Sequence, residues 1–277
     1  MHNASLFGTI ILLLTGLMTY KGFQDRRFFE NKAFVVDPIL INGEYKRLLT
    51  SGFLHVNWIH FAFNMIALLS FSSDLEVVYG LGKFSILYFA SMIGGNLLAL
   101  FIHRNHGDYS AVGASGAISG VILSFIVLFP SRSIGFILIP IDIKSWIFGL
   151  LFVAISIFGI KSQRDHIGHE AHLGGGIVGV LLTPLLAPSY LSIQWWLFAA
   201  ILIPSLLFLL LVARNPAVMM IRDYWGENLR DVRSAITRSR SPHNPEQELD
   251  QLLDKIRRNG FDSLNKNERD RLEELSK

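Results

Sequence analysis

The chain has 277 residues, of which 51% are hydrophobic and 17% charged, and its mean hydropathy is +0.41. This composition is too apolar for an ordinary soluble domain and indicates a polytopic membrane protein. The lack of cysteine excludes disulfides, thiolate nucleophiles and cysteine-based metal sites. The net charge of +3 is unevenly spread: residues 214–277 hold 13 of the 25 basic and 12 of the 22 acidic residues, which predicts a soluble tail.

Seven apolar segments follow one another, and each approaches the ~20 residues that a bilayer-spanning helix needs. They are residues 6–20, 56–71, 84–102, 111–129, 146–160, 171–187 and 193–213. The first segment lacks the basic start and small-residue exit of a cleaved signal, so we expect a retained span. The sequence therefore predicts an all-α membrane fold with seven spans and a long loop after the first.

The soluble tail is predicted to contain a linker, residues 214–245, and a small helical hairpin, residues 246–277. Apolar residues recur at helical spacing until Gly260, a helix stop signal. Asn265 and Glu268 have the spacing of a capping pair for a second helix. The hairpin is too small to be an enzyme, and we expect a docking or regulatory appendage whose partner the sequence does not identify.

Polar side chains inside or beside the apolar segments form three sets. Each needs a partner or a wet cavity, because an unpaired polar group in hydrocarbon costs several kcal/mol. His60 and Asn64 are four residues apart and share one helix face. The sets are His55, His60 and Asn64 in the second span, Ser115 in the fourth, and His166, His169 and His172 at the start of the sixth.

Two of these residues have the chemistry of a nucleophile and its base. Serine attacks well only when a base takes its proton, and a neutral histidine is the usual base. Ser115 precedes the GxxxG pair Gly116/Gly120, and His172 precedes the pair Gly175/Gly179. Such spacing lets two helices meet at backbone contact, which would bring the Ser115 hydroxyl beside the His172 imidazole.

Acyl transfer also needs hydrogen-bond donors that face the developing oxyanion, and His60 and Asn64 are suitable donors. We find no Asp or Glu deep in any span. The sequence therefore favours a Ser–His dyad over a full triad.

These residues resemble the rhomboid family of intramembrane serine proteases over nearly all of residues 1–190. The matching motifs stand in the family's order: Arg47-Leu-Leu-Thr-Ser-Gly-Phe-Leu-His55, His60-x-x-x-Asn64-Met65, Glu76-x-x-x-Gly80, Gly113-Ala-Ser-Gly116 and Ala171-His-x-Gly-Gly-x-x-x-Gly179.

The resemblance implies a six-helix core over residues 1–190. The last apolar segment adds a seventh transmembrane helix, residues 191–213, by the count of spans. It implies Ser115 as nucleophile and His172 as general base, with an oxyanion hole formed by His60, Asn64 and the backbone N–H of Ser115. It implies structural roles for Gly113, Gly116, His55, Arg47 and Glu76.

The expected substrates are transmembrane segments of single-pass proteins. The expected location is a bilayer, the bacterial inner membrane. We expect no cofactor, metal or nucleic acid to take part. The family orientation places the start of the chain in the cytoplasm and opens the site outward. The positive-inside tendency opposes that orientation for the basic tail, so the side of the tail stays open.

Two departures from the family pattern concern positions next to the site. Some members carry an aromatic residue four positions after the nucleophile, stacked on the base, whereas this chain has Ser119. The Trp-Arg pair of the first loop is Lys46-Arg47 here, after Tyr45. Support for the base must therefore come from elsewhere, and the anchoring of the loop is open.

Three alternatives remain. His166 and His169 are expected to be wet or structural. With His172 they could instead ligate a metal, but the zinc motif HExxH is not met, because Leu173 follows His172 and no further carboxylate is placed to help. The His and Asn residues could serve a transporter, although no intramembrane carboxylate chain accompanies them. A catalytically inactive relative that binds membrane clients is the third alternative, and the presence of both Ser115 and His172 speaks against it.

Overall fold

A computed structural model of the chain describes residues 4–136, 139–162, 167–190, 195–214 and 245–275. The residues form two compact units, Met1–Met220 and Ile221–Lys277. In chain order the elements are α1 (Leu6–Gln24), α2 (Arg26–Lys32), β1 (Phe34–Val35), α3 (Val36–Leu40), α4 (Arg47–Thr50), η1 (Ser51–Phe53), α5 (Trp58–His103), β2 (Ser110–Ala111), α6 (Ser115–Leu128), β3 (Ser133–Phe136), β4 (Ile139–Lys144), α7 (Ser145–Ser162), α8 (His169–Leu186), η2 (Pro188–Tyr190), α9 (Trp195–Arg214), α11 (Pro245–Asn259), η4 (Phe261–Ser263) and α12 (Lys266–Leu275).

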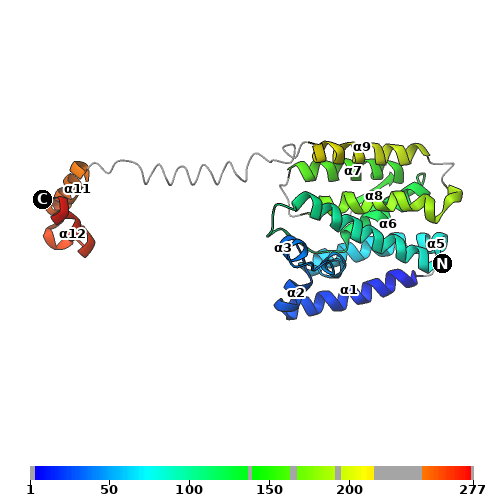
Figure 1. Cartoon of the computed structure of the whole chain (residues 1–277), viewed down its shortest axis with the longest axis horizontal. Helices are drawn as coiled ribbons and strands as arrows, with labels where there is room; N and C mark the ends of the chain where they lie inside the picture. The colour runs from blue at the N-terminus through cyan, green and yellow to red at the C-terminus, as the bar shows by residue number, and fades with distance from the viewer. Residues whose placement is uncertain (1–3, 137–138, 163–166, 191–194, 215–244, 276–277) are drawn as a thin grey trace. The chain divides into compact units, whose positions relative to one another are not determined.

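The first unit is a bundle of helices that run side by side, with α1 at one edge and α9 at the other (Figure 1). The 46 residues of α5 form two helices, because Gly80 between them has φ 68° and ψ 167°, a conformation outside the helical region. The seven predicted spans therefore correspond to α1, the two parts of α5, α6, α7, α8 and α9. The all-α membrane fold is confirmed.

Within the described residues, α1, α5, α7 and α9 are long and apolar enough to cross a membrane. The other two helices of the bundle differ for separate reasons. Helix α6 has only 14 residues, and α8 begins with the polar residues His169, Glu170 and His172. These two are also the helices on which Ser115 and His172 lie.

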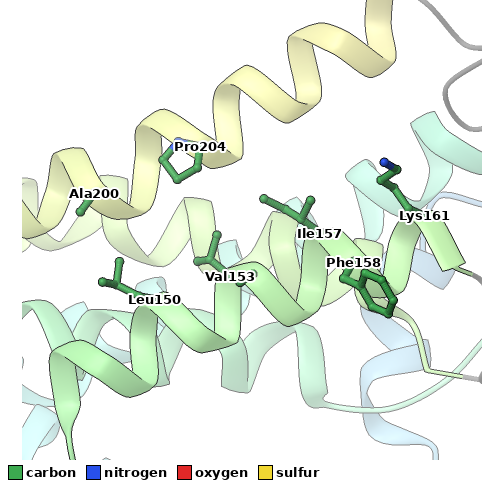
Figure 2. Close-up of a pocket in the computed structure, with 8 residues that line it drawn as sticks. Leu150, Val153, Ile157, Phe158, Lys161, Ala200 and Pro204 are labelled. Carbon is green, nitrogen blue, oxygen red and sulfur yellow. The ribbon is translucent and has the colours of Figure 1, made fainter.

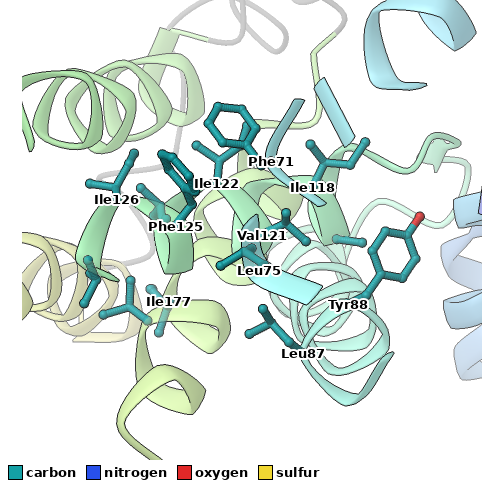
Figure 3. Close-up of a cluster of buried hydrophobic side chains, with 14 of the residues drawn as sticks. Phe71, Leu75, Leu87, Tyr88, Ile118, Val121, Ile122, Phe125, Ile126 and Ile177 are labelled. Atoms are coloured by element: carbon teal, nitrogen blue, oxygen red, sulfur yellow. The ribbon is translucent and has the colours of Figure 1, made fainter. Parts of the chain in front are cut away.

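Helix α6 is the central helix of the bundle. Every residue of α6 after Ser115 is buried, which explains why the segment carries no charge. Its side chains pack with those of α5 and α8 in one hydrophobic cluster (Figure 3).

Helices α6 and α8 meet at backbone contact along their glycines. A methyl group added at Gly175 would lie 2.7 Å from the carbonyl carbon of Gly116, and one added at Gly179 would lie 2.5 Å from the Cα of Gly120. Side chains at these positions would therefore push the two helices apart. The structure has the helix contact that the GxxxG spacing predicts.

The loop after α1 is ordered by short elements and buried polar contacts. Arg47 is 5% exposed, and its Nη1 donates to the carbonyl oxygens of Glu30 at 2.6 Å and Ala33 at 2.7 Å. Its Nε forms an ion pair with Glu44 at 2.6 Å. These contacts supply anchoring for a loop in which Lys46 takes the place of the usual tryptophan.

Two small antiparallel ladders depart from the all-helical expectation. Strand β1 pairs with β2, with Phe34 opposite Ala111 and Val35 opposite Ser110. Strands β3 and β4 form a hairpin before α7. Ladders this short leave no periodic signal in the sequence, because alternation needs several residues to be recognised.

Glu76 joins the middle of α5 to the start of α1. Its carboxylate accepts hydrogen bonds from the Ser5 hydroxyl and from the backbone N–H of Phe7 at 3.2 Å. The Ser5 hydroxyl in turn accepts from the backbone N–H of Gly8 at 2.9 Å and so caps α1.

An apolar groove of about 360 Å³ lies between α7 and α9 (Figure 2). It contains none of the predicted catalytic residues. Its walls are Leu150, Val153, Ala154, Ile157, Phe158, Lys161, Ala200 and Pro204. Pro204 lacks the N–H that would bond to the carbonyl of Ala200 within α9, which loosens the helix beside the groove.

The second unit contains the helical hairpin formed by α11, η4 and α12. Leu252 and Leu264 are its buried apolar residues. Gly260 ends α11 with φ 83°. The N–H of Asn265 donates to Glu268 Oε2 at 2.9 Å, and the N–H of Glu268 donates to Asn265 Oδ1 at 3.0 Å, which is a capping box. The predicted linker lies outside the described residues except at its ends, and the domain boundaries stay predictions.

Candidate active site

Ser115 is the first residue of α6 and is half-buried. Its backbone N–H is one of the N-terminal groups for which a helix offers no internal acceptor. The turn before it depends on Gly113, whose φ of 135° strongly favours glycine. A methyl group at Gly113 would lie 3.1 Å from His60 Nε2 and 3.8 Å from Ser115 Oγ. The His60 ring and the Ser115 hydroxyl therefore both lie next to Gly113.

His60 and Asn64 occupy the start of α5, as their spacing predicts. The backbone N–H of His60 donates to the N-cap side chain of Asn57 at 2.8 Å. Asn64 is 7% exposed, and its Nδ2 donates to the carbonyl oxygen of His60 at 2.9 Å. A side-chain amide has two N–H groups, so Asn64 keeps one for a ligand.

His55 packs edge-on against His60, with ring centroids 4.8 Å apart and an interplanar angle of 75°. Its Nδ1 lies 3.1 Å from the hydroxyl oxygen of Thr19 on α1. Burial, with a smaller contribution from His60, lowers the pKa of His55 to about 3, so the ring is neutral at physiological pH. His55 therefore supports the His60 ring from behind.

His172 is the fourth residue of α8, and its backbone N–H donates to the carbonyl oxygen of Gly168 at 3.1 Å. The first turns of α6 and α8 touch beside it. A methyl group at Gly116 would lie 3.2 Å from the carbonyl oxygen of Ala171 and 3.5 Å from its Cβ. The residue after Ser115 is therefore in contact with the residue before His172.

An aromatic ring supports His172, although it does not come from the position at which some relatives carry one. Phe152 of α7 stacks on the imidazole, with ring centroids 6.2 Å apart and an interplanar angle of 29°. Ser119 instead donates its hydroxyl to the carbonyl oxygen of Ser115 at 2.7 Å. Phe152 could not be recognised from the sequence, because it lies in an apolar helix among many similar residues.

Two polar residues at the start of α8 are buried. Glu170 is a buried carboxylate with 4% exposure, and its Oε1 lies 3.2 Å from Nε2 of His103. His169 is 6% exposed, which agrees with the structural one of its two expected roles and not with the wet one. No local signal marked Glu170 as buried, because its partner His103 lies on another helix. His166 lies outside the described residues, and in the described part of the chain no three metal-binding side chains converge.

Comparisons with known proteins identify relatives of this chain. A family profile described as "Rhomboid domain" matches residues 42–189, and one described as a family of unknown function (DUF6576) matches residues 241–277. Rhomboid protein 1, mitochondrial, of Saccharomyces cerevisiae is 34% identical over 57% of this chain and 45% of its own length. Rhomboid protease GluP of Bacillus subtilis is 33% identical over 52% of this chain and 26% of its own.

The chain thus spans less than half the length of these two relatives. The rhomboid match itself covers more than half of the chain, from before α4 into η2. Together with the polytopic helical bundle, that match shows that the chain belongs to the rhomboid family.

Proposed function

We propose that this protein is an intramembrane serine endopeptidase that cleaves transmembrane segments of single-pass membrane proteins. Ser115 is its nucleophile and His172 its general base. The observation that carries this proposal is the contact between the first turns of α6 and α8, where Gly116 meets Ala171. Similarity to a protein named as a rhomboid protease supports the proposal at the level of the reaction class.

The reaction uses four groups around Ser115. His172 takes the proton of the Ser115 hydroxyl as the oxygen attacks the substrate carbonyl, and the resulting imidazolium gives that proton to the leaving amine. Water then attacks the acyl-enzyme with the same base. The negative charge of each tetrahedral intermediate is stabilised by His60, by the free N–H of Asn64 and by the Ser115 N–H at the positive end of α6.

The site lies within a multi-pass bundle, so both substrate and enzyme reside in the bilayer. We place the protein in a bacterial cell membrane, although relatives occur in bacteria and in mitochondria. Ser115, His60 and His172 are half-buried rather than sealed, which lets an extended peptide and a water molecule reach them. No cofactor or metal takes part in this scheme.

The test uses the full chain reconstituted in liposomes with a model single-pass substrate. Ser115→Ala and His172→Ala should abolish cleavage, and Ser115→Ala should abolish labelling by a fluorophosphonate. Ser85→Ala is the matched control, because this half-buried membrane-helix serine donates to the carbonyl oxygen of Leu81 in its own helix. Cleavage that survives in Ser115→Ala would refute the proposal. Substrate binding without cleavage by the wild-type protein would favour an inactive client-binding relative.

A further inference from the structure

A buried pair of titratable side chains joins the end of α5 to the start of α8. Glu170 and His103 have side chains that are each 6% exposed, with Oε1 of Glu170 3.2 Å from Nε2 of His103. The His103 imidazole stacks on the ring of Tyr109 at a centroid distance of 3.6 Å and an angle of 6°. Its Nδ1 lies 3.4 Å from Nδ1 of His106. The His103 ring is thus stacked on one face and lies beside a carboxylate and a second imidazole, which restricts its orientation.

The surroundings of this pair favour a permanent contact. A carboxylate is buried at great cost unless it is paired, and Glu170 also benefits from its place in the first turn of α8, at the positive end of the helix. Burial and the charge of Glu170 raise the pKa of Tyr109, so the stacked phenol stays neutral. His103 is therefore the side chain that faces the buried carboxyl group of Glu170.

Glu170 and His172 lie on different sides of α8. Residues two apart on a helix point to nearly opposite sides, because each residue turns the helix by about 100°. Glu170 accordingly faces His103 on α5, whereas His172 stacks on Phe152 of α7. Glu170 is therefore not the third member of a catalytic triad.

The glycine contacts of α8 fix its distance from its neighbours. A methyl group at Gly95 would lie 2.5 Å from the carbonyl oxygen of Ala171, and the same carbonyl lies against Gly116. Such van der Waals contacts keep helices close but resist rotation about the helix axis only weakly. A directional contact between polar groups, such as that of Glu170 with His103, resists that rotation.

We infer that the Glu170–His103 pair sets the rotation of the first turn of α8 and thereby holds His172 in line with Ser115. This role of Glu170 as a positioning residue rests on the proposed function. A helix rotation of about 10° moves an atom about 6 Å from the axis by about 1 Å. A misplacement of that size can lower a catalysed rate about a hundredfold.

The test compares Glu170→Leu, His103→Leu and the double variant in the full chain. Each single variant leaves one buried polar partner and should lower the melting temperature. The double variant replaces both with apolar side chains and should recover the melting temperature. We expect the fluorophosphonate labelling rate of the double variant to stay ten- to a hundredfold below wild type, with KM for the single-pass substrate unchanged and kcat reduced.

If the pair only stabilises the fold, the labelling rate of the double variant should return to the wild-type value together with its melting temperature, and that result would overturn the inference. If the double variant does not fold, Glu170→Gln is compared with Thr183→Val, which removes a buried contact of 2.9 Å to Ser124 farther along α8. A loss of rate in Glu170→Gln no larger than in Thr183→Val overturns the inference. Cleavage by Ser115→Ala, measured in the same series, would instead refute the proposed function itself.

Discussion

Replacing Gly175 by alanine should separate the two helices that carry the proposed nucleophile and base. The added methyl carbon would lie 2.7 Å from the carbonyl carbon of Gly116 on α6, and closer still to that carbonyl oxygen. It would also lie 3.0 Å from the carbonyl oxygen of Ser91 on α5. Non-bonded carbons approach to about 3.5 Å, so α6 and α8 must move apart by about 1 Å.

Two effects of this separation can be estimated. Overpacking of this kind costs about 1–3 kcal/mol of stability. A displacement of about 1 Å between Ser115 and His172 should lower kcat about a hundredfold, because the proton transfer depends on their distance. The melting temperature in detergent measures the first effect, and single-turnover cleavage in liposomes measures the second.

Gly82→Ala is the matched control. Gly82 is also helical, but no heavy atom lies within 4 Å of the position that its methyl group would take. Alanine should therefore raise stability there by about 0.5–1 kcal/mol through its helix propensity, with no change in rate. A Gly175→Ala protein that melts and cleaves like wild type would show that the close approach of α6 and α8 is not needed for the site.

Three further predictions concern the support of the site. Phe152→Leu should lower the acylation rate about two- to tenfold, because an aromatic pair contributes about 0.5–1.5 kcal/mol. Phe152→Tyr keeps the aromatic ring and should keep the rate. Equal labelling rates in the two variants would contradict the stacking role of Phe152. Because the pKa of His55 falls from 6.5 to about 3 on folding, the unfolded chain binds more protons between these values. The free energy of unfolding should rise with pH across that window by about 1.4 kcal/mol per pH unit. In His55→Gln, the slope of the unfolding free energy against pH should be smaller by that amount. Arg47→Leu should lower the stability of the fold by about 2–4 kcal/mol, because it leaves the carbonyl oxygens of Glu30 and Ala33 without their donor. Equal melting temperatures of Arg47→Leu and Arg47→Lys would contradict this role of the Arg47 hydrogen bonds.

The spacing of glycines was the most informative local signal in the sequence. The pairs at 116/120 and 175/179 predicted the contact of two helices, and the structure has that contact. Hydropathy predicted seven spans, because a bilayer helix needs a long apolar segment. Two of them, residues 56–71 and 84–102, correspond to the two parts of α5, which the structure separates at Gly80. The roles of Ser115 and His172 stay predictions from residue chemistry and family motifs.

Other features depended on which segments meet in space. Nothing in the sequence pointed to a partner for Glu170, but α8 presents it to His103 of α5. The aromatic partner of His172 came from α7, because Phe152 packs against the first turn of α8.

The sequence by itself determined the class of this protein, because long apolar segments, glycine spacing and reactive side chains are all local properties of the chain. Only the tertiary structure decided how the base is supported. A buried charge or an aromatic ring acquires its role from a partner on a distant helix, and no local pattern specifies which helix that is.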